Sequence, residues 1–464
     1  MVFSSIEFIC LFMPAFFLMY YLAPYKYKNI VLLFGSLCFY AVGTINYPIH
    51  FILFIISLVV DYACGVFIID KPKYKKVFLT CGIMMHMLVL FYFKYSGFVF
   101  GELGKRIAFL DIDISPVLPI GISFYTFQGV SYIVDVYRGT VEVERNILNY
   151  GVYISMFEQL IAGPIVTYSQ VRKELRNRRI EFRNVMTGVA IFIFGLGFKV
   201  LLANQLGGLW SDVTTIGYDS ISTPLAWMAI IAYSLQLYFD FWGYSLMAIG
   251  IGKMLGFNIP KNFDFPYLSL TMTEFWRRWH ITLGSWFREY VYIPLGGNRQ
   301  GKFKHIRNLF VVWLLTGVWH GAGYNFALWG IVLFIILLVE KYCTGKFFNK
   351  YPVVGHIYMI LLIPITWTVF VIENIGQMGV FFSRLFPFFG QGVWSVFRHD
   401  YIKYWNNYWM FILIGIILCM RWPFNLLKKI KNVVIITVIC LAILAASVYC
   451  MYMGLDDPFL YFRF

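Results

Sequence analysis

Long apolar stretches, separated by charged or turn-forming residues, follow one another along almost the whole chain. A helix that crosses a bilayer needs about 20 apolar residues, because each residue adds only about 1.5 Å along the helix axis. The pattern predicts about twelve spanning helices and a single all-α transmembrane domain over residues 1–464. The predicted spans are residues 6–22, 30–45, 49–69, 77–100, 117–137, 184–206, 223–252, 308–321, 325–340, 353–373, 406–420 and 433–452.

Two other stretches are apolar but do not fit a simple crossing. YGVYISMFEQLIAGPIVTYSQ is interrupted by Gly163 and Pro164 and predicts a re-entrant segment, which is tolerated only where protein or a wet cavity shields the backbone. TEFWRRWHITLGSWFREYVYIPLGG alternates aromatic and aliphatic residues with charges near helical spacing. It predicts a helix lying at the membrane interface.

Composition and charge agree with a multi-pass membrane protein. The 464 residues are 60% hydrophobic and 13% charged, with a mean hydropathy of +0.71 and a formal net charge of +15. Most lysines and arginines fall in predicted loops on one side, which the positive-inside rule makes cytoplasmic, so both termini are predicted to face outward. The positive charge is explained by its role in orienting the protein in the membrane and by contact with anionic lipid headgroups. We expect no nucleic-acid partner.

The chain contains none of the common cofactor or metal motifs. Its eight cysteines include no CxxC pair, and there is no P-loop, HExxH or GxSxG sequence. We therefore expect neither a disulfide framework nor a bound metal or cofactor. Any chemistry must depend on histidine and on placed polar groups.

One histidine, His320, lies in the apolar stretch LLTGVWHGAGYNFALWG. If Arg307 marks the cytoplasmic boundary, a helix carries His320 only about 20 Å into a hydrocarbon core of about 30 Å. The return helix, about Phe326 to Glu340, is predicted to be equally short, so the backbone of the GAGYN turn needs a water-filled cavity or protein partners. An imidazole there suits proton removal near neutrality, and Asn325 offers a hydrogen bond. A plain interhelical hydrogen bond by His320 explains the pattern equally well.

Other polar residues at membrane depth are weaker candidates. In the span 223–252, Gln236, Asp240 and Tyr244 follow at i, i+4 spacing, which favours a cavity lining over an isolated interhelical bond. His280 lies in the interfacial stretch, where a role in the aromatic belt is at least as reasonable as a role in chemistry. Further residues that either line a path or pair within the bundle are Asp61, Gln128, Asp135, Glu158 and Lys199. The other histidines receive no role: His50, His86, His305, His356 and His399.

Several stretches, taken together and in order, resemble the membrane-bound O-acyltransferase (MBOAT) family, specifically its bacterial alginate O-acetylase branch. They are MVFSSIEFICLFMP, EQLIAGPI, LQLYFDFWGYSLMAIG, EFWRRWHITLGSWFREYVYIPLGGNRQG, LTGVWHGAGYNFALWG and DPFLYFRF. The resemblance implies a multi-helix bundle with interfacial helices around a thin centre, in the bacterial cell membrane. It also implies transfer of an acyl group, most simply acetyl, from a cytosolic thioester such as acetyl-CoA to an extracytoplasmic polysaccharide, often through an SGNH-type partner transferase.

The resemblance also assigns residues. His320 takes the position of the essential histidine, and His280 matches a second histidine toward the cytoplasm. In that scheme His320 accepts a proton from an acceptor hydroxyl while Asn325 or nearby amides stabilise the oxyanion, and Trp319 lies on the substrate path. Three arginines on the predicted inner face are candidates for contacts with the phosphates of coenzyme A, and a purely interfacial role explains them equally well: Arg277, Arg278 and Arg299.

The chain departs from the branch at a few positions. Glu158 stands where the branch commonly has proline, and Trp242 and Leu246 where it often has a small residue and an acid. The acid that the branch often has at the position of Leu246 is absent here, so no role of it is carried over. Asp240 is the acidic candidate that remains.

Two rival functions remain open at this stage. The D-alanyl transfer proteins of teichoic acids share the WRRWH stretch and use a thioester on a carrier protein as donor. A transporter of a lipid-linked sugar or small metabolite is the other rival, although no internal repeat of the kind common in transporters is visible.

Overall fold

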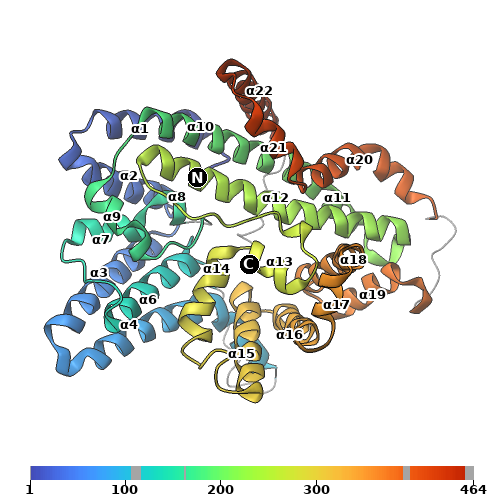
Figure 1. The fold of residues 1–464 in the computed structure, drawn as a ribbon, viewed down its shortest axis with the longest axis horizontal. Coiled ribbons are helices and arrows are strands. Elements are labelled where there is room, and N and C mark those ends of the chain that lie inside the picture. Colours follow the sequence, from blue (N-terminus) through green and yellow to red (C-terminus); the bar gives the residue numbers. More distant parts are fainter. Residues whose placement is uncertain (1, 106–115, 161–162, 390–397, 455–464) are drawn as a thin grey trace. The chain divides into compact units, whose positions relative to one another are not determined.

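The computed structural model describes residues 2–105, 116–160, 163–389 and 398–454, and these ranges contain only helices, turns and loops (Figure 1). The predicted helical fold class is confirmed. The chain divides into two compact units: the first comprises Met1–Phe192 and Tyr244–Lys261, and the second Ile193–Gly243 and Asn262–Phe464. The closing stretch DPFLYFRF, used above for the resemblance, lies outside the described residues.

Short 3₁₀ and π-helical turns join the α-helices of each unit. The first unit contains α1 (Met13–Leu22), α2 (Lys28–Gly43), α3 (Pro48–Asp70), α4 (Lys75–Leu90), α5 (Ser96–Gly104), α6 (Ile122–Arg138), α7 (Ile147–Ser155), α8 (Phe157–Leu160) and α9 (Tyr168–Asn177). Two helices contribute residues to both units: α10 (Phe182–Gly197) and α12 (Thr223–Leu255). The second unit contains α11 (Asn204–Ile216), α13 (Met272–Arg278), α14 (Ile281–Phe287), α15 (Lys302–His320), α16 (Tyr324–Val339), α17 (Gly345–Lys350), α18 (Pro352–Val371), α19 (Ile375–Leu385), α20 (Asp400–Leu418), α21 (Trp422–Lys429) and α22 (Val433–Tyr452).

Six helical runs among the described residues are long and apolar enough to cross a membrane, which establishes a multi-pass membrane protein. They are Pro48–Asp70, Pro72–Gly104, Phe182–Ile216, Tyr324–Lys350, Pro352–Val371 and Val433–Tyr452. Helices α20 and α21, bent by 73° at their junction, make a seventh if they are one broken span. Each predicted span coincides largely with a helix, but the total of twelve crossings is not confirmed.

The stretch predicted to be re-entrant contains only short helices. Helix α7 has 9 residues and α8 has 4, with a break at Met156. Nine residues extend about 14 Å, well below the thickness of the hydrocarbon core of about 30 Å. The ring of Phe157 packs against those of Phe12 and Phe16, with centroids 5.4 and 5.1 Å apart, so α8 is anchored in an aromatic core. Ile161 and Ala162 of this stretch lie outside the described residues.

A buried acid and base form a pair in the first unit. His86 Nε2 on α4 lies 2.8 Å from Asp61 Oδ1 on α3, and both side chains are 1% exposed. Gly129 on α6 makes room for them, since a Cβ there would lie 2.2 Å from Asp61 Oδ2. The sequence assigned no role to His86, and the structure gives it a buried acidic partner. Its partner lies 25 residues earlier, and sequence spacing alone gives no sign of such a contact.

The hairpin of α15 and α16 in the second unit also differs from its prediction. Glu340, taken as the end of the return helix, lies inside a continuous helical run from Tyr324 to Lys350, so this arm is not short. The helix continues because the Glu340 side chain is buried and hydrogen-bonded. The two arms pack closely at glycine: a Cβ on Gly317 would lie 2.3 Å from the carbonyl oxygen of Phe326.

Candidate active site

The interfacial stretch of the second unit is held in place by Glu340. Its carboxylate accepts hydrogen bonds from the backbone amides of Met272 (2.6 Å) and Thr273 (2.8 Å), at the start of α13, and from the Thr273 hydroxyl (2.7 Å). Tyr358 on α18 also donates to it, at 3.2 Å. A carboxylate at a helix N-terminus satisfies free amides and interacts favourably with the helix dipole. Helix α13 is thereby fixed to α16 and α18.

His280 interrupts the predicted interfacial helix. Instead of one helix over residues 273–297, the structure has α13 and α14 separated at Trp279 and His280, and His280 has φ 44° and ψ 55°. Among the described non-glycine residues only Phe265 and His280 have positive φ. This conformation is unfavourable for a residue with a side chain, and it persists only where the surroundings enforce it. Because of this break, the His280 side chain does not point in the direction that a continuous helix would give it.

Asn262 fixes the orientation and the tautomer of His280. The Oδ1 atom of Asn262 accepts hydrogen bonds from the backbone amide (3.3 Å) and the hydroxyl (2.7 Å) of Thr282. Because a backbone N–H only donates, the Asn262 atom beside it must be its oxygen. His280 Nδ1, 3.2 Å from the same oxygen, therefore carries the hydrogen and donates it. Its Nε2 is then the unprotonated nitrogen.

The Nε2 atom of His280 is buried and has no hydrogen-bond partner among the described residues. The side chain is only 2% exposed, and burial lowers the pKa of His280 to about 3, so the imidazole is neutral. A buried acceptor without a hydrogen-bond donor is unfavourable. A ligand that donates a hydrogen bond would remove this cost.

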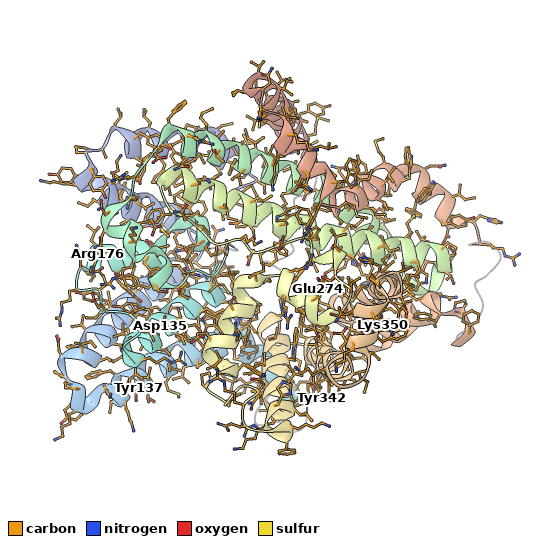
Figure 2. The ribbon with its side chains drawn as sticks, in the orientation of Figure 1. Asp135, Tyr137, Arg176, Glu274, Tyr342 and Lys350 are labelled. Atoms are coloured by element: carbon orange, nitrogen blue, oxygen red, sulfur yellow. The ribbon has the colours of Figure 1, made fainter. Side chains whose placement is uncertain are left out.

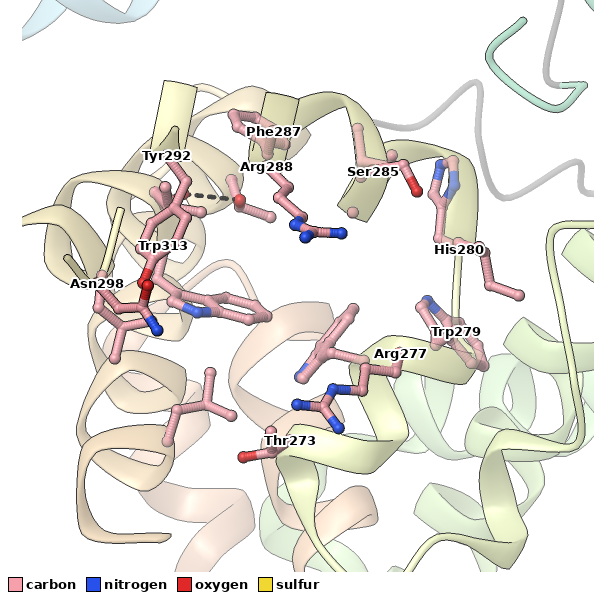
Figure 3. Close-up of a pocket in the computed structure, with 18 residues that line it drawn as sticks. Thr273, Arg277, Trp279, His280, Ser285, Phe287, Arg288, Tyr292, Asn298 and Trp313 are labelled. Carbon is pink, nitrogen blue, oxygen red and sulfur yellow. Dashed lines mark hydrogen bonds between the residues drawn. The ribbon is translucent and has the colours of Figure 1, made fainter. Parts of the chain in front are cut away.

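His280 lies on the wall of a cavity of about 680 Å³ formed by α13, α14, α15 and the loops around them (Figure 3). Its lining is mainly aromatic and aliphatic, with indoles from Trp276, Trp279 and Trp313. The indole Nε1 of Trp276 is a buried donor with no acceptor in the described chain. The wall thus offers one hydrogen-bond acceptor, His280 Nε2, and one donor, Trp276 Nε1, to a largely apolar ligand.

Two arginines at this cavity are available to bind an anionic group. Arg277 and Arg288 both line it and are exposed, and the Arg288 guanidinium points into the central space between the labelled side chains (Figure 3). Of the predicted arginines, only Arg277 is among them. Arg278 is paired with Glu274 at 2.5 Å (Glu274 is labelled in Figure 2), and Arg299 is exposed outside the cavity lining.

His320 ends α15 beside the glycine turn, as the sequence predicts. Its ring lies 4.8 Å from that of Trp319, 5.3 Å from Trp329 and 5.2 Å from Phe370, measured between centroids. Trp319 also neighbours His280, with centroids 6.4 Å apart. The structure thus brings the two predicted histidines to the same indole, although they lie 40 positions apart in the sequence.

Asn325 is the first polar residue of the return helix. It is fully buried, and its Nδ2 donates to the carbonyl oxygen of Phe370 at 2.7 Å. This bond ties the N-terminus of α16 to the end of α18 and fixes the amide orientation. The Oδ1 atom is left without a donor among the described residues, so it suits acceptance of a hydrogen bond from a hydroxyl group.

The three residues of the predicted polar stripe lie on the continuous helix α12 and have different surroundings. Asp240 forms an ion pair with Lys199 at 2.8 Å, and both side chains are almost fully buried. Gln236 packs against Gly207, where a Cβ would lie 2.4 Å from its Nε2. Tyr244 belongs to the first unit and stacks on Phe3, with centroids 4.7 Å apart.

Gln128 also belongs to the first unit. Its side chain is buried and has no hydrogen-bond partner among the described residues. Sequence reasoning missed Asn262, Trp276 and Arg288, because no local pattern marks the contacts that place them here.

Comparisons with known proteins identify the family of this chain. Residues 141–372 match the model of the MBOAT, membrane-bound O-acyltransferase family. The chain is 37% identical over 409 residues to a probable alginate O-acetylase AlgI of Pseudomonas syringae pv. tomato, covering 85% of this chain and 76% of the relative. It is 34% identical to the peptidoglycan O-acetyltransferase of Helicobacter pylori, covering 81% and 78%. It is 29% identical to the teichoic acid D-alanyltransferase of Bacillus subtilis, over 50% and 60%. The chain belongs to the membrane-bound O-acyltransferase family.

Proposed function

We propose that this acyltransferase moves an acetyl group from a cytosolic acyl thioester, most simply acetyl-CoA, to hydroxyl groups of a polysaccharide outside the bacterial plasma membrane. The relatives with the broadest matches are named as O-acetylating proteins of alginate and peptidoglycan, both carbohydrate polymers. The match to the D-alanyltransferase covers only half of the chain, so we rank D-alanyl transfer as the second candidate function. An extracytoplasmic SGNH-type transferase is the proposed partner, and both termini are proposed to face outward.

The cavity at His280 carries the proposal, because it suits the donor. Coenzyme A consists of a long pantetheine arm with amide N–H groups and a charged phosphate end. An apolar, aromatic cavity accommodates the arm, and Arg277 and Arg288 at its edge suit the phosphates. The unprotonated Nε2 of His280 accepts a hydrogen bond from an arm amide and so positions the thioester.

The chemical step is assigned to His320. Its imidazole accepts the proton of an acceptor hydroxyl as that oxygen attacks the thioester carbonyl carbon. A carbon–oxygen bond forms, the carbon–sulfur bond breaks, and the proton passes to the departing thiolate. The Trp276 indole N–H is a candidate donor to the thioester carbonyl, and Asn325 Oδ1 is a candidate acceptor from the incoming hydroxyl.

Acetyl transfer by the purified chain tests this function directly. The protein is reconstituted in vesicles with its proposed partner, and acetyl-CoA labelled in the acetyl group is supplied on one side. We expect label to appear on an acetylatable polysaccharide on the other side. Transfer from a D-alanyl carrier protein instead would favour the rival donor. Movement of a sugar or metabolite without loss of label from any acyl donor would favour a transporter.

The tautomer of His280 predicts a change in pH dependence when Asn262 becomes aspartate. A carboxylate beside Nδ1 stabilises the imidazolium and raises the pKa of His280 by about 1 to 3 units from its low value. Below the raised pKa, Nε2 is protonated and no longer accepts a hydrogen bond. We expect the KM for the donor to rise as pH falls toward 5 in Asn262→Asp and to stay flat in the wild type.

The measurement is the KM for acetyl-CoA between pH 5 and pH 8. Asn298→Asp is the matched control, because it adds the same charge at the cavity without touching His280. Identical pH profiles for the two variants would contradict the assigned tautomer.

A further inference from the structure

A second cavity, of about 510 Å³, lies wholly within the first unit. One wall comes from α9 and the segment that leads to α10, and the other from the end of α12 and the residues after it. The lining is mainly polar, unlike that of the cavity at His280. Its charged residues are four basic side chains and two acidic ones: Lys173, Arg178, Arg179, Lys253, Glu174 and Glu181.

The basic residues around this cavity differ from their neighbours on α9. Arg172 and Arg176 lie outside the cavity, and each is paired with a glutamate; Arg176, labelled in Figure 2, lies 3.2 Å from Glu144. Lys173, Arg179 and Lys253 have no acidic partner in the part of the chain that the structure describes. Like charges without counterions repel one another, so an anion in the cavity would relieve this repulsion.

The two acidic residues of the lining are not ion-paired with these cations. Glu174 accepts a hydrogen bond from Asn258, and Glu181 accepts one from Asn184, each at 3.4 Å. They reduce the positive potential of the cavity but leave an excess of basic over acidic side chains.

Arg178 adds a buried charge to the wall. It is 5% exposed, its Nε donates to the Tyr20 hydroxyl (2.7 Å) and its Nη1 to Asn29 Oδ1 (2.6 Å). Both acceptors are neutral, and Nη2 has no partner among the described residues. The buried carboxyl of Glu158 interacts with Arg178, but burial raises the pKa of Glu158 to about 7, so it is only partly ionised near neutrality. A buried guanidinium with incomplete compensation is costly.

We propose that this cavity binds a phosphate-bearing anion, either the headgroup of an anionic phospholipid or a soluble phosphate compound. Phosphate oxygens accept hydrogen bonds from arginine and lysine together, and a dense set of unpaired cations favours such a ligand. Lys253 is in the last turn of α12, a helix that the sequence predicts to cross the membrane, so the cavity lies at one end of a predicted span. The loops that form it, within residues 171–183 and 253–307, are among the basic loops that the positive-inside rule predicts to be cytoplasmic, where anionic lipids are concentrated.

Nanodiscs with the full chain distinguish the two sources. One arm uses a mixture of phosphatidylcholine and phosphatidylglycerol and measures the phosphatidylglycerol retained on the protein by native mass spectrometry. The other arm uses phosphatidylcholine alone and measures the binding of inorganic phosphate. Retention in the first arm identifies a lipid headgroup, and saturable binding in the second identifies a soluble phosphate compound.

The test variant carries Arg179→Gln and Lys253→Gln, which spares the buried Arg178. The matched control carries Lys76→Gln and Arg183→Gln, two exposed basic residues of the same unit outside the cavity. Each charge near a lipid surface contributes about fivefold in affinity, so we expect binding to weaken about 25-fold in the test variant and little in the control. Equal binding by the two variants in both arms would overturn the proposal.

Discussion

Replacing His280 with glycine is expected to lower kcat/KM for the thioester donor by about 100-fold or more, mainly through a higher KM. The substitution removes the Nε2 acceptor that we assign to positioning the donor, and misplacement by about 1 Å costs on the order of 10² in rate. Glycine suits the backbone at this position, because it adopts the left-handed conformation of His280 without strain. The kinetics of acetyl transfer measure the loss.

Phe265→Gly is the matched control for this variant. Phe265 is the other described non-glycine residue with positive φ, so the same substitution relieves the same backbone strain and removes a ring that does not line the cavity. We expect its KM for the donor to stay near the wild-type value. Added imidazole should partly restore transfer in His280→Gly and have no effect in the control. A KM for the donor equal to the wild-type value in His280→Gly would contradict the role of His280 in positioning the donor.

The helices and the position of His320 could be predicted from sequence because both depend on local pattern. Apolar runs of sufficient length form helices in a membrane for a general reason: the backbone must satisfy its own hydrogen bonds. His320 was identified because it is followed at once by a glycine-rich turn, which ends α15. These features need no knowledge of the neighbouring helices.

The break at His280 could not be predicted, because its cause lies elsewhere in the fold. The alternation of apolar and charged residues continues through this position at helical spacing, and histidine gives no sign of a left-handed backbone. The conformation is stabilised by Asn262, 18 positions earlier. The break also changes which arginine reaches the cavity, so that Arg288 lines it and Arg278 does not.

The partners of charged residues could not be predicted for a related reason. Glu340 looks like the end of a membrane helix until its four hydrogen-bond donors from α13 and α18 are seen. Asp240, favoured as a cavity residue from its spacing, is ion-paired with Lys199, a contact that spacing does not indicate. A charge inside an apolar stretch indicates a partner or a cavity, and only the tertiary structure decides between them.

Replacing His320 with glutamine is expected to lower kcat by about 10² to 10⁴ while leaving the KM for the donor unchanged. Glutamine keeps a polar, helix-compatible side chain at the end of α15 but cannot accept the proton of an acceptor hydroxyl near neutrality. The KM should not change, because His320 does not line the cavity assigned to the donor. Loss of kcat alone marks an interaction made in the transition state.

His305→Gln provides the control for this variant, since His305 lies on the same helix and bonds to the Tyr342 hydroxyl at 2.9 Å, on the lysine-rich end of α15. We expect it to accumulate in the membrane and to transfer acetyl groups at close to the wild-type rate. Acetate on surface polysaccharide in cells and kcat in vesicles are measured for both. The opposite patterns expected for His280→Gly and His320→Gln separate binding of the donor from proton transfer. Undiminished acetylation in His320→Gln would mean that another group removes the proton, even if the chain is an acetyltransferase.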